Sequence, residues 1–469
     1  MRTKKINKKQ QLKQSKGITL IALVITIIVL LILAGVSIVT LTGENGILTR
    51  ADNAKIETTK AEARERIQLE TSVSFDNTGK YNADTAIENL KNNAKIPAEH
   101  ITKNDNTLTV KLEGYKFYVD DKGNVELFPT TVTEAITQKI VFPDNTRLKD
   151  SYGNSITVPA GFKIASDSAI DVAQGVVIED ATYEGTLGSQ FVWIPVGTVT
   201  GKVKGVEKTE TIILGRYDFT KNSDGTITTS AYTGAYVEEN AKDTQNLLKY
   251  GNAIAEDIEA FKASTGADKN GGYYIGRYEA GLTTTSKLST TDMSDSKTAP
   301  NEKWTGWSKQ DGTQAQIVCK QGQQVWNYIT QNEASELSKN MYTNDLKFTS
   351  DLINSYAWDT AIVFIQTFGV EDNSSIYSCQ GGVSTDRNKP SMTGSSILSS
   401  INKVDKQCNI FDMAGNCFEW STETSSNSDR PCVTRGGYYL YNDNFTGTRG
   451  GCSINHAHSW ISFRPILYL

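Results

Sequence analysis

The first apolar segment of the chain, Ile18–Leu41, contains no charged residue. A cleavable secretion signal has an apolar core of about 7–15 residues, whereas about 20 apolar residues suffice to cross a bilayer as a helix. The segment therefore predicts a membrane-spanning helix. Lysines are frequent in residues 1–17, and positive charge ahead of a span favours a cytoplasmic N-terminus. We expect the residues after Leu41 to lie outside the cell.

The pattern after this segment favours a continuing helix. Gly43 and Gly46 each weaken a helix locally by about 1 kcal/mol. A stretch rich in Ala, Glu, Lys and Arg then extends to about Glu70, with small residues at helical spacing. We expect one long helix over residues 18–70, with a soft point near the two glycines.

A small head is predicted over residues 71–128. The stretch "NADTAIENLKNN" places Ala86, Ile87 and Leu90 on one side of a short helix. The stretch "LTVKLEGYKFYVDDKGNVELF" alternates apolar and polar residues across a "DDKGN" turn, which indicates a hairpin. Together they predict a helix and a small β-structure that pack on the long helix, ending near Phe128.

The remainder is predicted to be a linker and one large domain. Residues 129–154 contain two prolines and no sustained periodicity, which is typical of a linker or an irregular segment. Residues 155–469 form one large domain, or a domain with insertions, in which long Thr-, Ser-, Asn- and Gly-rich stretches read as surface loops. The expected fold class is α+β.

Composition and cysteine content narrow the range of functions. The net charge is -5, so nothing indicates a nucleic-acid partner. The six cysteines allow three disulfides in fifteen pairings, and the absence of CxxC argues against a zinc knuckle. An exported domain permits disulfides, but an anaerobic host would leave all six cysteines reduced.

The boundary of the leader carries a resemblance to a known family. Residues 1–17 end in Lys16-Gly17, and "ITLIALV" follows at once. This resembles the processing site of type IV pilins and type II secretion pseudopilins. The resemblance implies a prepilin peptidase that cuts after Gly17, a new N-terminus at Ile18, other pilin subunits as partners, and a single-pass membrane protein able to join a surface pilus. The family's glutamate at the fifth position after the cut is Ala22 here, which counts against efficient polymerisation. A simple N-terminal anchor is the alternative.

A second resemblance rests on five blocks in a fixed order. They are "SQFVWIPVG" from Ser189, "GGYYIGRYEAG" from Gly271, "NIFDMAGNCFEWSTE" from Asn409, "RGGYYLYNDNFTGTRGG" from Arg435 and the terminal "SFRPILYL". In this order they resemble the formylglycine-generating (sulfatase-modifying factor) family over roughly residues 160–469, although residues 200–270 match nothing. The resemblance implies a variant of the C-type lectin fold with a small twisted sheet and much ordered loop.

The same resemblance implies the chemistry of the domain. Family members bind calcium at the Asn and Glu that correspond to Asn416 and Glu419, and calcium takes six to eight oxygen ligands. The alternative is a capped turn with Glu419 bonded to backbone. The family's enzymes use two copper-binding cysteines, where this chain has Tyr441 and Thr446. Copper(I) selects soft sulfur ligands, so we expect no such activity and no catalytic residue.

Several residues of these blocks are expected to be structural. Trp420 and Phe418 are large apolar anchors for a core. Arg464 is expected to be a buried, hydrogen-bonded brace, because a guanidinium presents five donors in a fixed geometry. The glycines of Arg435-Gly436-Gly437 suit a strand that passes close to another backbone.

The end of the chain has the composition of a recognition surface. Windows 438–448 and 453–459 are rich in Tyr, Asn, Asp, His, Ser, Thr and Gly, the mixture that antibody loops use. No lysine follows Lys406, and each window residue can arise by changing only the adenines of an asparagine codon. This resembles the variable proteins of diversity-generating retroelements. A plain polar surface is the alternative. The predicted ligand-binding residues are Tyr438, Tyr439, Tyr441, Asn442, Asn444, Phe445, Asn455, His456, His458 and Trp460.

These observations predict a pilin-like subunit that presents a non-catalytic, lectin-like domain to an external protein or glycan ligand. One alternative is a structural minor pilin without a specific ligand. Another is an enzyme of unfamiliar type on the same fold. His456 and His458 project to the same side of a strand, but two imidazoles without a third ligand make a poor metal site.

Overall fold

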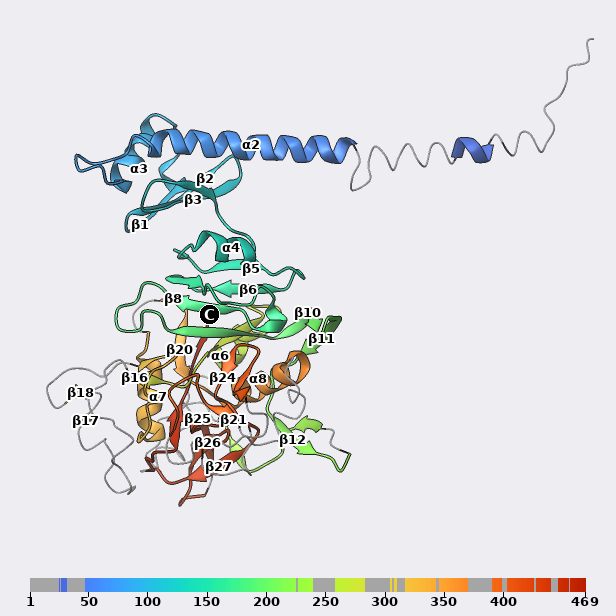
Figure 1. Ribbon diagram of the computed structural model, residues 1–469, viewed down its shortest axis with the longest axis vertical. Coiled ribbons are helices and arrows are strands. Elements are labelled where there is room, and N and C mark those ends of the chain that lie inside the picture. Colours follow the sequence, from blue (N-terminus) through green and yellow to red (C-terminus); the bar gives the residue numbers. More distant parts are fainter. Residues whose placement is uncertain are drawn as a thin grey trace, which may run out of the picture. The chain divides into compact units, whose positions relative to one another are not determined.

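The computed structural model describes residues 25, 27–31, 47–224, 227–238, 258–282, 304–305, 308–309, 317–342, 346–369, 390–398, 403–425, 427–439, 446–454 and 456–469 (Figure 1). The chain divides into two compact units, Met1–Phe128 and Pro129–Leu469. No helix within the described ranges is both long enough and apolar enough to cross a membrane. Gly17, Ile18 and most of the expected span over residues 18–41 lie outside these ranges.

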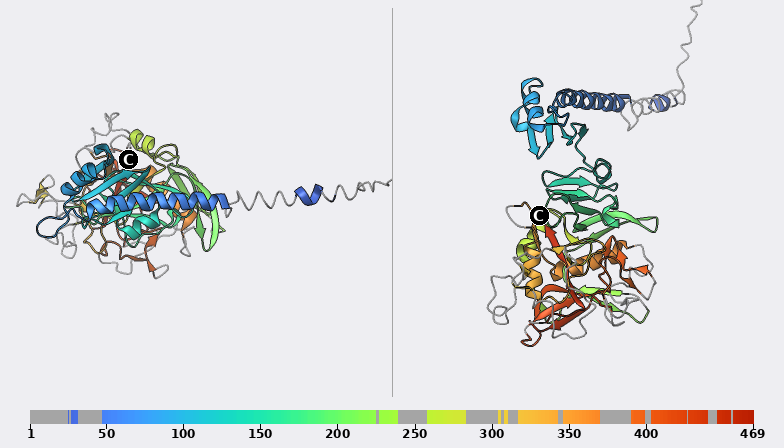
Figure 2. Two further views of the ribbon diagram at one scale, coloured as in Figure 1. Left: turned by 90° about the horizontal axis from the view of Figure 1, so that it is seen from above. Right: turned by 60° about the vertical axis from the view of Figure 1, so that its left-hand side comes forward.

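The first unit contains one long helix, one short helix and a sheet. Helix α2 spans Ile47–Thr71 and helix α3 spans Ala83–Asn92. The side chain of Asn82 caps α3 by accepting a hydrogen bond from the backbone N–H of Thr85 at 3.0 Å. The N-terminal half of α2 continues beyond α3 and the strands of this unit (Figures 1 and 2), and its described side chains up to residue 58 are exposed.

The sheet of the first unit is a four-stranded antiparallel meander. Its strands are β1 (Ile101–Asn104), β2 (Thr107–Leu112), β3 (Tyr115–Val119) and β4 (Val125–Leu127), and a short 3-10 helix (Ala98–His100) precedes them. The pattern predicted only one hairpin, across the "DDKGN" turn between β3 and β4. It missed a two-residue turn at Glu113 and Gly114, which both have positive φ angles, as the tightest hairpin connections require.

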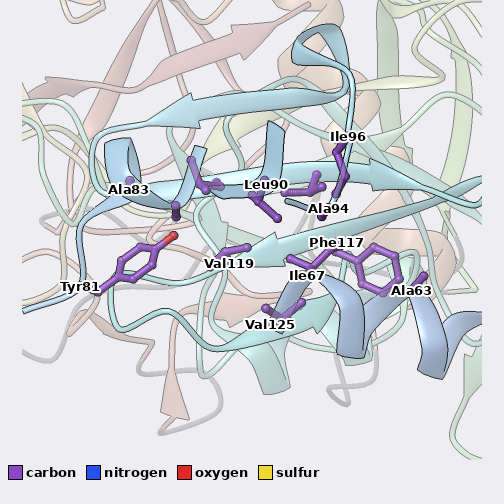
Figure 3. Close-up of a cluster of buried hydrophobic side chains, with 13 residues drawn as sticks. Ala63, Ile67, Tyr81, Ala83, Leu90, Ala94, Ile96, Phe117, Val119 and Val125 are labelled. Carbon is purple, nitrogen blue, oxygen red and sulfur yellow. The ribbon is translucent and has the colours of Figure 1, made fainter. Parts of the chain in front are cut away.

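The core of the first unit lies between the helices and the sheet (Figure 3). Ala63 and Ile67 from α2 meet Leu90 from α3 and the strand residues Phe117 and Val119. All are at most 2% exposed. The amphipathic pattern of α3 is therefore explained by packing, with Ala86 and Leu90 buried as expected.

The predicted linker over residues 129–154 is wrong. Helix α4 (Val132–Gln138) and strand β5 (Thr146–Lys149) lie in this stretch, and β5 pairs with β6 (Ser155–Val158). Helix α4 begins with a capping box between Thr131 and Glu134. The stretch is too short for a visible periodicity, yet it buries Val132, Ala135 and Leu148 in the second unit.

The main sheet of the second unit joins segments far apart in sequence. Its order is β20 (Thr349–Leu352), β29 (Pro465–Tyr468), β15 (Gly272–Gly276), β9 (Gln190–Pro195), β8 (Val177–Asp180) and β7 (Phe162–Ile164). Three of the sequence blocks, "SQFVWIPVG", "GGYYIGRYEAG" and "SFRPILYL", thus supply the adjacent strands β9, β15 and β29. Helix α8 (Ser355–Phe368) contacts β9, and helix α7 (Gln331–Lys339) contacts β20.

A second sheet has the order β14 (Tyr236–Val237), β25 (Phe418–Ser425), β26 (Cys432–Arg435) and β27 (Arg449–Cys452), and β28 (Ile461–Phe463) pairs with β25 in parallel.

Short elements complete the unit. They are η2 (Val172–Gln174), α6 (Ile258–Thr265) and the strand pairs β10 (Gly197–Val203) with β11 (Val206–Ile212), β12 (Tyr217–Lys221) with β13 (Ile227–Ala231), β16 (Gly281–Leu282) with β19 (Ile317–Val318), β17 (Trp304–Thr305) with β18 (Ser308–Lys309), β21 (Ile397–Leu398) with β22 (Lys403–Val404), and β23 (Lys406–Gln407) with β24 (Ile410–Phe411). The second unit is therefore a loop-rich mixture of helix and sheet, as predicted.

Candidate functional site

Strand β25 brings the end of the chain beside the "GNCFEW" block. It runs parallel to β28, with Phe418 opposite Ile461. The backbone N–H of Phe418 donates to the carbonyl of Trp460 at 2.9 Å. On its other side β25 pairs with β26, from which the chain continues into residues 436–448. Described residues from both windows of the predicted recognition surface therefore lie beside this strand.

Seven rings gather at this point, and we call them the tail aromatic cluster. Its members are Tyr328, Phe418, Tyr438, Tyr439, His456, His458 and Trp460. Phe418 stacks on Tyr438 with 4.6 Å between ring centroids, and Tyr438 lies 5.3 Å from Trp460. The rings of His458 and His456 lie 4.4 and 5.2 Å from that of Trp460. Five of the ten predicted binding residues, including Trp460 itself, therefore belong to this cluster.

The cluster has a buried base and a half-buried top. Tyr438 is 8% exposed and Tyr439 is 3% exposed, so these two predicted binding residues belong to the packed base of the cluster. Tyr439 is held by a hydrogen bond from its N–H to the carbonyl of Asn416 and by a contact between its hydroxyl and that of Ser459. His456, His458 and Trp460 are half-buried. The remaining predicted residues, Tyr441, Asn442, Asn444, Phe445 and Asn455, lie outside the described residues.

The two histidines of the cluster are uncharged near neutral pH. Burial lowers the pKa of His458 to about 4, with His456 contributing, and burial also lowers the pKa of His456. The Nδ1 atom of His458 lies 3.2 Å from the hydroxyl of Ser459. The Nε2 atom of His456 is buried and makes no hydrogen bond within the described part of the chain. The top of the cluster therefore offers flat, neutral rings with polar edges.

The predicted calcium ligands are occupied by protein groups. Both carboxylate oxygens of Glu419 accept hydrogen bonds from Arg464, at 2.9 and 2.5 Å. The amide oxygen of Asn416 accepts from the N–H of Ser391 at 2.7 Å, and its amide nitrogen donates to Glu279. A guanidinium bound to both oxygens of Glu419 repels a cation, so these contacts count against the predicted calcium site at Asn416 and Glu419, which stays a prediction. Arg464 is fully buried, as expected for a brace.

Buried carboxylates order the turn that contains Asn416. Asp405 accepts hydrogen bonds from the N–H groups of Ala414 and Gly415 at 2.9 and 3.0 Å. Burial raises the pKa of Asp412 to about 8, and the neighbouring Asp405 adds to this. Asn416 itself has a φ of 64°, a conformation that asparagine tolerates better than most residues. The role of this block is therefore to hold a tight turn below the cluster.

An ionic network fastens the base of residues 436–448, and we call it the tail clamp. Arg435 on β26 and Arg449 on β27 lie opposite each other in register. Arg435 donates to Glu423 at 2.9 Å and Arg449 donates to Glu423 at 2.8 Å, and both also donate to Asp359 on α8. Arg216 donates to Glu423 at 2.6 Å. The clamp closes the two ends of the segment that carries Tyr438 and Tyr439.

The partners of Arg435 could not be predicted from the sequence. Nothing in the local pattern distinguishes Glu423 or Asp359 from exposed acids, although both side chains are fully buried. The Gly436 prediction is confirmed. Its φ is 84°, and a Cβ there would lie 2.8 Å from the carbonyl oxygen of Met413. Trp420 is confirmed as a core residue, fully buried, with its indole N–H donating to the carbonyl of Ile329 at 2.7 Å.

Comparisons with known proteins give only distant similarities. No family model and no curated protein matches the chain. One similar solved structure is the crystal structure of CarF, at 12% identity and a TM-score of 0.26, covering 42% of this chain and 87% of that one. Another is Treponema denticola variable protein 1, at 12% identity and a TM-score of 0.27, covering 58% and 99%. A third is the Major Tropism Determinant U1 variant, at 10% identity and a TM-score of 0.24, covering 72% of this chain and 97% of that one. At TM-scores this low, these similarities assign neither a fold nor a function to this chain.

Proposed function

We propose that the second unit is a non-catalytic, lectin-like binding module and that the tail aromatic cluster, with the adjoining residues 440–445 and 455, is its ligand site. The observation that carries the proposal is the half-buried group of His456, His458, Trp460 and Phe418 around the buried ring of Tyr438. The ligand is a protein or a glycan outside the cell. The non-catalytic assignment rests on Tyr441 and Thr446 at the positions of the copper-binding cysteines.

The physical basis is that rigid, amphipathic rings bind with little loss of conformational entropy. Trp and Tyr are enriched among the residues that dominate binding energy, and they supply contact area with only two side-chain torsions each. The neutral histidines add hydrogen-bonding edges without the desolvation cost of a charge. The tail clamp below them supports a preorganised surface, and preorganisation lowers the entropic cost of association.

The display of this module is proposed from the sequence. A leader that ends at Gly17, processing before Ile18 by a prepilin peptidase and an apolar helix would tether the module to the membrane or to other pilin subunits. The composition of windows 438–448 and 453–459 supports diversification of the ligand site. In this proposal the chain is a single-pass protein with its two units outside the cell.

The test is ligand binding by the full chain and by a Trp460→Ala variant. Arrays of glycans and of cell-surface proteins identify a ligand, and titration then gives its affinity. Truncation of a central aromatic residue should weaken binding by at least about tenfold. Ile213→Ala is the matched control, because Ile213 is an apolar side chain of the same unit that is 63% exposed and lies outside the cluster.

The outcomes separate the alternatives. Weaker binding by Trp460→Ala, with an unchanged control and a folded variant, supports the ligand site. A ligand that binds all three proteins equally places the site elsewhere. The absence of any ligand on either array favours a structural minor pilin.

A further inference from the structure

Two cysteines lie directly opposite each other at the base of the tail. Cys432 is the first residue of β26 and Cys452 is the last residue of β27, and the antiparallel register pairs them. Residues directly opposite in an antiparallel pair have Cα atoms about 4.5–5.5 Å apart with side chains on the same face. A disulfide requires Cα atoms about 4.4–6.8 Å apart. The backbone of β26 and β27 therefore already meets the main geometric requirement for a bridge.

No other two of the five described cysteines are partners in the register of paired strands. Cys408 lies against the carbonyl of Ala173 and Cys417 against that of Ser459, while Cys319 is buried beside Gly276. The sequence allowed fifteen pairing patterns, and the register of one strand pair selects a single bridge.

We propose that Cys432 and Cys452 form a disulfide that covalently closes the segment carrying Tyr438 and Tyr439 of the tail aromatic cluster. The bond adds to the Arg435–Arg449 pair in the same two strands, three residues away along each strand. It closes a loop of about 20 residues, a length at which a cross-link removes substantial conformational freedom from the unfolded chain. The inference stands on the strand register and does not depend on a ligand for the cluster.

The oxidant is an external disulfide, either a small molecule or an oxidoreductase. Cys452 is half-buried and Cys432 is fully buried, so the first attack comes from Cys452. Its thiolate forms a mixed disulfide with one sulfur of the oxidant and releases the other as a thiol. The Cys432 thiolate then attacks the Cys452 sulfur and releases the second thiol. Two protein thiols become one disulfide, the oxidant becomes two thiols, and the electrons balance.

The burial of the two cysteines affects how fast the bond forms and how fast it is reduced. Burial raises the pKa of Cys452 to about 11, so formation by small disulfides is slow at neutral pH and faster in alkali. Once formed, the bond has one sulfur inaccessible to reductants. A reductant then reaches the bond only through the half-buried sulfur of Cys452, so we expect reduction to be slower than that of a fully exposed disulfide.

The experiment is peptide mapping of the full chain after incubation with glutathione disulfide. Cleavage by trypsin yields the peptide 407–435, which contains Cys432, and the peptide 450–469, which contains Cys452. We expect these two peptides to be joined without reductant and separate after reduction, with the bond located at Cys432 by fragmentation. When the protein is alkylated without reductant, the oxidised sample should show at least about tenfold less alkylated Cys452 than the sample that was not oxidised.

A matched control lies in the same tryptic peptide. Cys408→Ser leaves the proposed bond intact, so the joined peptides should persist, whereas Cys432→Ser should abolish them. Oxidation should raise the thermal midpoint of the wild type and of Cys408→Ser by about 5 °C and leave that of Cys432→Ser unchanged. If Cys432→Ser does not fold, the fragmentation of the wild-type peptides still decides. A bond from Cys452 to Cys408 or Cys417, or full alkylation of Cys432 and Cys452 after oxidation, would overturn the proposal.

Discussion

Glu423 is the centre of the tail clamp, and its replacement by Gln gives the sharpest test of that assignment. Its carboxylate accepts hydrogen bonds from Arg216, Arg435 and Arg449, and its side chain is fully buried. Glutamine has nearly the same volume but no charge, and its amide nitrogen would place a donor against the donors of a guanidinium. Glu423→Gln therefore removes the charge that compensates three cations and leaves the packing otherwise unchanged.

The expected cost follows from the pKa of the group. Burial alone raises the pKa of Glu423, but Arg435, Arg449 and Arg216 outweigh burial and lower it from 4.5 to about 2. A difference of this size corresponds to about 3 kcal/mol of stability in the ionised state. Removal of one partner from a buried ion pair costs about 3–5 kcal/mol in other proteins, so the two routes agree. We expect Glu423→Gln to lower the free energy of unfolding by about 3 kcal/mol at pH 7.

The same pKa fixes the pH dependence of this cost. The folded pKa lies below the unfolded value, so the stabilisation is complete above about pH 4.5 and is lost as the pH falls towards 2. The difference between wild type and Glu423→Gln should therefore shrink to about 2 kcal/mol at pH 3.5. A purely steric effect of the substitution would not change with pH.

The assay is urea denaturation of the full chain, followed by tryptophan fluorescence. All seven tryptophans lie in the second unit, between Trp193 and Trp460, so the signal reports on the unit that contains the clamp. Glu207→Gln on β11 is the control, because Glu207 is exposed and should not alter stability. A cost below about 1 kcal/mol at pH 7, or a cost that is the same at pH 7 and pH 3.5, would refute this account of the clamp.

Four further predictions follow from the structure and sequence. Trp420→Ala should lower the free energy of unfolding by about 3–5 kcal/mol, because the ring is fully buried and its N–H bonds to Ile329; urea denaturation with little change would contradict the core assignment. Burial, with help from Glu423, raises the pKa of Glu238 to about 7, so the wild type should lose stability as the pH rises from about 4.5 to 7. A Glu238→Gln variant should lose less stability over this range, and a loss equal to that of the wild type would count against the raised pKa of Glu238. Mass spectrometry of protein from the native cell should find Ile18 as the N-terminus, and an intact Met1 would exclude processing. Incubation with copper and a cysteine-containing sulfatase peptide should yield no aldehyde, and a detectable aldehyde would show that the chain is an enzyme.

Local pattern was sufficient wherever the determining interactions lie close together in sequence. Asn82 caps α3, and the spacing of Ala86 and Leu90 places both in the core. A close approach of two backbones was expected at Gly436, and a Cβ there would lie 2.8 Å from the carbonyl oxygen of Met413. The burial of Trp420 and Arg464 was also predictable, because a large ring and a five-donor guanidinium in a loop-rich domain need a packed, hydrogen-bonded environment.

Tertiary structure alone decided the chemistry of the site. Both oxygens of Glu419, a predicted calcium ligand, accept hydrogen bonds from Arg464, which lies 45 positions later in the chain. Tyr439 has the composition of a surface residue, yet contacts with Asn416 and Ser459 bury it.

The tail clamp shows the physical reason most clearly. Glu423 is 207 positions from Arg216 in the chain, and no local pattern encodes that approach. A buried charge is stable only with partners, and which partners reach it depends on the packing of β25, β26, β27 and α8. The sequence by itself determined the types of element and several core residues, whereas the folded structure decided which polar groups compensate one another and which rings remain accessible to a ligand.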